Sequence, residues 1–189
     1  MKILAIRGNN LASLAGKFEI HFNREPLSSS NIFAICGPTG SGKSTLLDAL
    51  CLALYDKTPR LNRDRTSSVD LPDVGKETIT PRDPRYLLRR GTGEGFAEVD
   101  FVGNDGVEYR AHWSVRRAHG KADGKLQDTE MELKTLADEQ SIGGKKGEVL
   151  KEIKKRLGLE FDQFTRAVLL AQNEFAAFLK TDNDGRGTL

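Results

Sequence analysis

One stretch decides how the fold of this chain is interpreted: Gly37-Pro38-Thr39-Gly40-Ser41-Gly42-Lys43-Ser44-Thr45. It fits the pattern G-x-x-x-x-G-K-[ST] of the phosphate-binding P-loop. Glycines at the first, fourth and sixth positions let successive backbone N–H groups converge on anionic oxygens. The lysine brings a positive charge to the β- and γ-phosphates, and the serine after it offers a hydroxyl ligand to Mg²⁺. We therefore expect residues 37–45 to bind a nucleotide.

The residues on either side of this loop support the same interpretation. The apolar run Asn31–Cys36 (NIFAIC) predicts a buried strand. The segment Thr45–Tyr55 (TLLDALCLALY) predicts a largely buried helix, because its leucines recur at helical spacing. Strand, loop and helix in this order is the context that the motif requires. The phosphates would then lie at the N-terminus of the helix, where free N–H groups and the helix dipole favour anions.

Length and composition set broad limits. The 189 residues allow one domain, or two small ones, with a real hydrophobic core. No secretory or membrane-spanning run is present in the sequence, so we expect no membrane partner. Cys36 and Cys51 lie inside apolar segments and are predicted to be buried, inert thiols of a reducing cytoplasm. The three histidines form no zinc-binding pattern.

Two alternating runs precede the loop. Lys2–Arg7 and Lys17–Phe22 predict an antiparallel hairpin, with Gly8–Gly16 turning the chain between them. Small nucleoside kinases do not begin with a hairpin before the P-loop. The heads of ATP-binding-cassette proteins do, with the first strand and its turn near the nucleotide.

Three further strands follow the loop and its helix, and they predict an antiparallel sheet beside the nucleotide-binding core. They are Phe96–Val102, Val107–Val115 and Glu130–Leu136. Tyr109 and Trp113 share one face of the second strand, and we predict that they are core residues rather than platforms for stacking bases. Two helices are expected at Gly147–Leu157 and Phe161–Ala167.

Basic residues gather in two segments. Residues 57–90 lack periodicity and carry nine Lys or Arg against five Asp or Glu. These charges are either a solvated face or contacts to the phosphate backbone of DNA. The candidates in this segment are Arg60, Arg63, Arg65, Arg89 and Arg90. A predicted turn after the second of the three strands adds Arg116, Arg117, His119, Lys121 and Lys125.

An acidic residue for hydrolysis is missing from the pattern. P-loop enzymes that hydrolyse nucleotides usually carry an apolar strand that ends in Asp. This acidic end of the strand serves in Mg²⁺ binding and in the activation of water. Neither Asp70 nor Asp100 follows a continuous apolar run, and the run that fits, Val168–Ala171, ends at Gln172. An amide oxygen can bind Mg²⁺ and orient water; alternatively, Gln172 is only a surface amide at a strand end. We expect Lys43 and Gln172 to act in catalysis, and Ser44 and Gln172 to bind Mg²⁺.

Two longer stretches resemble a known family. They are residues 33–55 (FAICGPTGSGKSTLLDALCLALY), followed by TPRL, and residues 164–179 (FTRAVLLAQNEFAAFL). Both are similar to the SbcC family, the exonuclease ATPase subunits of bacteria within the wider group of SMC-like proteins. The resemblance extends from about Met1 to Leu179.

The resemblance implies an α/β fold: the N-terminal lobe of an ATP-binding-cassette-type P-loop ATPase head with an added antiparallel β-sheet. Residues 1–180 would form this lobe, and residues 181–189 would begin the connection to an absent coiled coil. The Walker A motif of the family matches Gly37–Thr45, and its Q-loop glutamine matches Gln172. Some relatives have a basic residue in the first turn, where this chain has Ala12, so no nucleotide contact is assigned there. The candidate segment for the adenine is Thr58–Arg65.

The family also implies a function. ATP and Mg²⁺ would drive the engagement of two heads, which regulates a partner nuclease during the processing of DNA double-strand breaks and hairpins. The implied partners are the C-terminal half of the same head, a second head, an SbcD-type nuclease subunit and double-stranded DNA, in the bacterial cytoplasm at the nucleoid. Three alternatives remain: another SMC-like repair or chromosome-organising ATPase, a self-sufficient P-loop nucleotide kinase, and a nucleotide-sensing module without catalysis.

Overall fold

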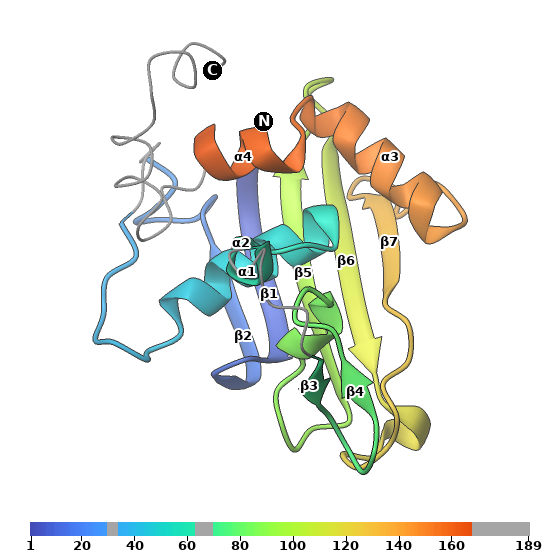
Figure 1. Ribbon diagram of the computed structural model, residues 1–189. Coiled ribbons are helices and arrows are strands. Elements are labelled where there is room, and N and C mark those ends of the chain that lie inside the picture. Colours follow the sequence, from blue (N-terminus) through green and yellow to red (C-terminus); the bar gives the residue numbers. More distant parts are fainter. Residues whose placement is uncertain (30–33, 63–69, 168–189) are drawn as a thin grey trace, which may run out of the picture.

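A five-stranded antiparallel sheet organises the protein. The computed structural model describes residues 1–29, 34–62 and 70–167 (Figure 1). The sheet has the strand order β2-β1-β5-β6-β7. Its strands are β1 (Lys2–Leu11), β2 (Leu14–His21), β5 (Glu94–Val102), β6 (Glu108–Arg116) and β7 (Glu130–Thr135). The other elements are α1 (Lys43–Tyr55), α2 (Pro59–Asn62), the ribbon β3 (Leu71–Pro72) and β4 (Thr78–Ile79), the short turns η1 (Pro84–Leu87) and η2 (Ala118–Gly120), α3 (Lys146–Leu157) and α4 (Phe161–Ala167).

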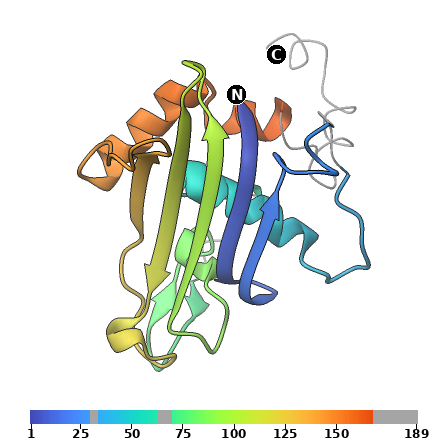
Figure 2. The same cartoon turned by 180° about the vertical axis from the view of Figure 1, so that it is seen from behind.

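The helices cover one face of this sheet. α1 packs against β1, β5 and β6, and α3 packs against β7 and α1. Seen from behind, the opposite face carries none of the described helices (Figure 2). The core lies between α1 and the sheet, and alternate residues of β6 from Tyr109 to Val115 are buried in it. The predicted buried face of this strand is confirmed, except for Val107, which is exposed.

The hairpin is longer than the sequence predicted. β1 and β2 pair antiparallel, and Gly8 and Asn9 still pair with Phe18 and Lys17, so the chain turns only at Ala12 and Ser13. The predicted turn over residues 8–16 is therefore wrong. β1 also pairs with β5, so the hairpin and the three later strands form one sheet. This pairing satisfies the backbone groups of β1 on both of its edges.

The predicted strand before the loop is not confirmed. Residues 30–33 lie outside the described residues, and Ala34, Ile35 and Cys36 form no strand and are exposed. Ile35 is 40% exposed, since none of the described strands pairs with this segment. The predicted burial of Cys36 is therefore wrong, whereas Cys51 is buried inside α1. Burial raises the pKa of the Cys51 thiol, which keeps that thiol protonated.

The C-terminal end of α1 is fixed by one aspartate. Asp56 has a left-handed conformation with φ 53°, and its N–H donates to the carbonyl of Leu52. Its Oδ1 accepts a hydrogen bond from the indole Nε1 of Trp113 at 2.6 Å. Its Oδ2 lies 2.5 Å from the Nζ of Lys146 at the start of α3. Asp56 thus joins α1, β6 and α3, and Trp113 is a core residue as predicted.

The later helices agree with the sequence as far as the structure describes them. α3 and α4 match the two predicted helices, and the buried side of α3 consists of Val149, Ile153 and Leu157. The predicted strand ending at Gln172 lies outside the described residues. Within the described ranges, no helix is both long and apolar enough to span a membrane.

Candidate functional site

The loop that precedes α1 is exposed and depends on two glycines. Residues 37–41 are all exposed, and the N–H of Ser41 donates to the carbonyl of Pro38 at 3.2 Å, closing a turn. Gly40 and Gly42 have φ of 85° and 92°, a left-handed conformation that other residues rarely adopt. A Cβ at Gly42 would lie only 2.4 Å from Cδ2 of Leu14. Any larger residue at Gly42 would therefore force the Leu14 side chain to move.

The N-terminus of α1 is suited to an anion. The helix begins at Lys43 after the N-cap Gly42, which offers no side-chain cap, and its first turn contains no acidic residue. The partial positive charge of the helix end is therefore not neutralised by the protein, and its first N–H groups face the loop. Together with the exposed loop, this arrangement fits the phosphates of a nucleotide.

Lys43 and Ser44 are the first two residues of α1, directly after the glycine loop. The Nζ of Lys43 donates to the carbonyls of Gly37 at 2.6 Å and Pro38 at 2.8 Å, which hold the ammonium group at the loop. Ser44 is exposed, whereas Thr45 is buried and its hydroxyl lies 3.0 Å from that of Ser13. Of the two adjacent hydroxyls, the one of Ser44 is therefore accessible to a metal ion.

The turn between β1 and β2 lies against this loop. Ser13 contacts Thr45, and Leu14 packs beside Gly42, so the turn touches the first turn of α1 from one side. The turn therefore lies beside the loop that is expected to bind the nucleotide. Ala12, at the tip, brings no charge to the site.

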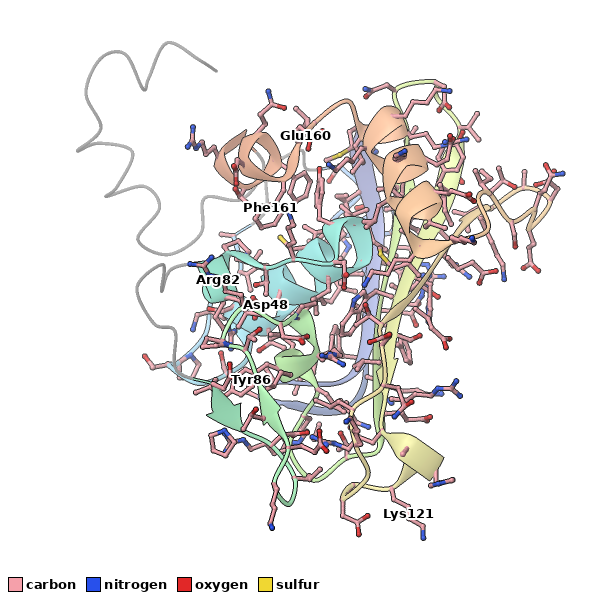
Figure 3. All side chains as sticks on the ribbon, turned by 45° about the vertical axis from the view of Figure 1, so that its right-hand side comes forward. Asp48, Arg82, Tyr86, Lys121, Glu160 and Phe161 are labelled. Atoms are coloured by element: carbon pink, nitrogen blue, oxygen red, sulfur yellow. The ribbon has the colours of Figure 1, made fainter. Side chains whose placement is uncertain are left out.

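The segment proposed for the adenine is occupied by contacts within the protein, where it is described. The hydroxyl of Thr58 is buried and donates to Asp48 on α1. Arg60 pairs with the same carboxylate at 2.5 Å, and Figure 3 shows Asp48 among the side chains around α1. Thr58 and Arg60 therefore stabilise the P-loop helix. Arg63, Arg65 and Gln172 lie outside the described residues.

The basic residues of the turn after β6 differ in burial: some are buried and others are exposed. Arg117 is only 6% exposed, and its two terminal nitrogens donate to Asp73 at 2.9 and 2.6 Å. These hydrogen bonds lower the pKa of Asp73, and they fix the turn to the β3–β4 ribbon. Arg117 is therefore excluded as a DNA contact, because its charge is buried and paired. Arg116 has a side chain that is 67% exposed, and Lys121 points away from the body of the protein (Figure 3).

A network of charges that the sequence did not reveal crosses the open face of the sheet. Asp100 accepts hydrogen bonds from Arg7 at 2.7 Å and from Arg110 at 2.7 and 2.9 Å. Burial alone would raise the pKa of Asp100, but the two guanidinium groups outweigh burial and hold this pKa below its ordinary value. Asp100 is thus an ionised structural partner of two strands, and its carboxylate faces away from α1.

Comparisons with known proteins agree with the predicted resemblance. Residues 5–186 match the family described as AAA domain. The whole chain is similar to the SbcC component of the SbcCD nuclease of Pseudomonas aeruginosa, at 57% identity over 190 residues, and to that of Rhodobacter capsulatus, at 46% over 189 residues. A probable DNA double-strand break repair Rad50 ATPase of Aquifex aeolicus is 29% identical over 83% of the chain. The chain spans only 16%, 15% and 13% of the lengths of these three relatives.

Proposed function

The chain belongs to the AAA domain family, and on this premise we propose that residues 1–180 form the nucleotide-binding lobe of an ATP-binding-cassette-type head in an SMC-like DNA-repair ATPase. The observation that carries the proposal is the placement of the glycine loop. It is exposed, it leads into an uncapped helix N-terminus, and Lys43 lies within it. The similarity to SbcC and Rad50 proteins supports this assignment over a nucleotide kinase.

In the proposed site the loop holds the phosphates, and two side-chain oxygens bind the metal ion. The backbone N–H groups of residues 37–45 and the ammonium group of Lys43 hold the β- and γ-phosphates. Ser44 and Gln172 provide two oxygen ligands to Mg²⁺, and Gln172 also responds to the γ-phosphate. The bound Mg²⁺ would neutralise phosphate charge during phosphoryl transfer. Two carbonyls accept hydrogen bonds from the Lys43 ammonium group and keep it at the loop.

The proposed site lacks an acidic group for hydrolysis among the residues assigned to it. Asp100 is held by Arg7 and Arg110 on the far face of the sheet, and Asp48 is buried beside Thr58 and Arg60. We therefore propose that the C-terminal half of the same head supplies the Walker B acid. Two such heads would enclose ATP between them and regulate an SbcD-type nuclease on double-stranded DNA.

A steady-state ATPase assay tests this division of labour. Residues 1–189 alone are expected to show almost no turnover, because phosphoryl transfer depends on several charged groups acting together and the loss of one costs orders of magnitude. Addition of the complementary C-terminal segment of the head should restore activity. The specific activity should then rise with protein concentration, since the active species is an engaged pair of heads.

Two other results of this assay would favour a different function. Robust turnover by residues 1–189 alone, at a specific activity independent of concentration, would contradict the proposal and favour the self-sufficient kinase. ATP binding without any activity, even in the presence of the complementary segment, would favour a nucleotide-sensing module.

DNA binding by the turn after β6 is the second part of the proposal. Arg116 and Lys121 are exposed at one end of the sheet, and among the described residues this end carries only the short turn η2 and no long helix that could read bases. We expect binding that is independent of DNA sequence and falls steeply with salt. The double variant Arg116→Gln/Lys121→Gln should weaken binding and reduce the slope of log K against log salt by up to about one for each phosphate that no longer has a cationic partner.

The matched control removes the same charge elsewhere. Lys2 and Lys17 are exposed on β1 and β2, and the double variant Lys2→Gln/Lys17→Gln should leave the salt slope as it is. Fluorescence anisotropy with a labelled duplex at several salt concentrations measures both slopes. Equal slopes for the two double variants would indicate that DNA contacts a surface other than this turn.

A further inference from the structure

We propose that Arg89 is a positioning residue for the phosphate-binding loop: it fixes the turn between β1 and β2, and this turn supports the first turn of α1. The inference rests on the proposed function, because it assigns a role in nucleotide binding to a residue that lies outside the motif. The connection runs from Arg89 through Ala12 and Ser13 to Gly42 and Thr45.

The first step is the contact between Arg89 and the turn. The Nη1 of Arg89 donates to the carbonyl of Ala12 at 3.1 Å and to that of Ser13 at 3.0 Å. The backbone of the same segment is also engaged, since the N–H of Arg89 donates to the carbonyl of Asn10 at 2.9 Å and the N–H of Ala12 donates to that of Leu87 at 2.8 Å. One half-buried guanidinium thus fixes two consecutive carbonyls at the tip of the hairpin.

The second step is the conformation that these contacts hold. Asn10 and Ala12 have φ of 50° and 43°, in the left-handed region that L-residues rarely adopt. Such a conformation persists where the surrounding structure determines it. Charge-assisted hydrogen bonds are stronger than neutral ones, so Arg89 is the contact best able to keep the tip in this shape.

The third step leads from the turn to the loop. The hydroxyl of Ser13 lies 3.0 Å from that of buried Thr45, and Leu14 fills the space beside Gly42. Gly42 and Thr45 directly flank Lys43 and Ser44, the two residues proposed to hold phosphate and Mg²⁺. If the turn loosened, the first turn of α1 would lose its support on this side. Arg89 therefore acts on nucleotide binding through the backbone of its neighbours, without touching the nucleotide.

Calorimetric titration of residues 1–189 with two probes tests this role. Mg-ATP and Mg-tripolyphosphate share the phosphates, but only ATP has a nucleoside. Arg89→Ala should weaken both probes by a similar factor of about five, since it removes charge-assisted contacts that order the loop. Arg89→Lys should lie between this variant and the wild type, because a lysine keeps the charge but cannot reproduce the guanidinium geometry.

Two further variants keep the test informative. Ser13→Ala removes the contact to Thr45 without altering Arg89, and it should weaken both probes by roughly twofold even if Arg89→Ala does not fold. Lys17→Ala removes an exposed cation from the same hairpin and should bind both probes like the wild type. Thermal unfolding of every variant separates a local change from a general loss of structure.

The results that would contradict these expectations distinguish failure of the inference about Arg89 from failure of the proposed function. Wild-type affinity in folded Arg89→Ala, or in Ser13→Ala, would overturn the inference while leaving the proposed function intact. Weaker binding of ATP alone, with tripolyphosphate unaffected, would also overturn it, because the turn would then contact the nucleoside. If the wild type binds neither probe and Lys43→Ala makes no difference, the proposed function itself has failed, and the inference fails with it.

Discussion

Lys43→Ala is expected to weaken the binding of Mg-ATP by tenfold or more while the fold stays intact. The lysine side chain donates to the carbonyls of Gly37 and Pro38 in an exposed loop and is not buried, so we expect its removal to leave the core unchanged. A charge-assisted hydrogen bond contributes about 1.5–3 kcal/mol, which corresponds to roughly a factor of 10 to 100 in affinity. Calorimetry gives the dissociation constant directly.

The matched control is Lys57→Ala. Lys57 is an exposed lysine just beyond the other end of α1, and its loss changes the net charge of the protein by the same amount. The control should bind Mg-ATP like the wild type. An unchanged dissociation constant for Lys43→Ala would show that residues 37–45 are not the phosphate site, whatever their resemblance to the motif.

Trp113→Ala should be the most destabilising single substitution among the sheet residues discussed above. The side chain has no exposed surface, and its indole donates to Asp56 at 2.6 Å. Truncation of a buried tryptophan costs about 3–5 kcal/mol in the free energy of unfolding. For a domain of this size we expect a decrease in the melting temperature of roughly 10 °C, which differential scanning calorimetry measures.

Two other variants separate packing from hydrogen bonding. Trp113→Phe keeps most of the ring volume and loses only the bond to Asp56, whose carboxylate retains Thr129 and Lys146 as partners, so a smaller cost of about 1–2 kcal/mol is expected. Tyr86→Ala, at an exposed aromatic residue, should cost little. If Trp113→Ala were no worse than Tyr86→Ala, the described core would be wrong.

The sequence predicted those parts of the fold that depend on local periodicity. Alternation in β5, β6 and β7 identified both the strands and the buried face around Trp113. The glycines at both ends of residues 8–16 favour a chain reversal that the strand pairing contradicts. Gly8 is instead a strand residue at a close approach, since a Cβ there would lie 2.4 Å from the ring of Phe18.

Features that depend on strand register could not be predicted. Arg7, Asp100 and Arg110 meet because β5 lies between β1 and β6 in one particular register, which a single sequence does not encode locally. Arg116 and Arg117 are neighbours of the same type, yet only Arg117 turns inward to Asp73. The different roles of such residues are decided by contacts with distant segments.

Some features of the candidate site could likewise be predicted from the sequence, and others could not. Residues 37–45 could be proposed as a phosphate site from the sequence alone, because the spacing of glycine, lysine and serine is itself the chemical requirement. The turn between β1 and β2 was expected nearby, but the contact of Ser13 with Thr45 and the hydrogen bonds from Arg89 to this turn were not. Both depend on segments separated from the loop by more than 20 residues of sequence, and no motif marks them.

The central claim is that residues 37–45 hold the phosphates of ATP, and an NMR titration of the ¹⁵N-labelled chain with Mg-ATP tests it most directly. Backbone amides report binding without any assumption about hydrolysis or partners. We expect the largest saturable changes in chemical shift at Gly40, Gly42, Lys43, Ser44 and Thr45, and the same pattern with Mg-tripolyphosphate. Saturable shifts that leave these amides unchanged and gather elsewhere would contradict it.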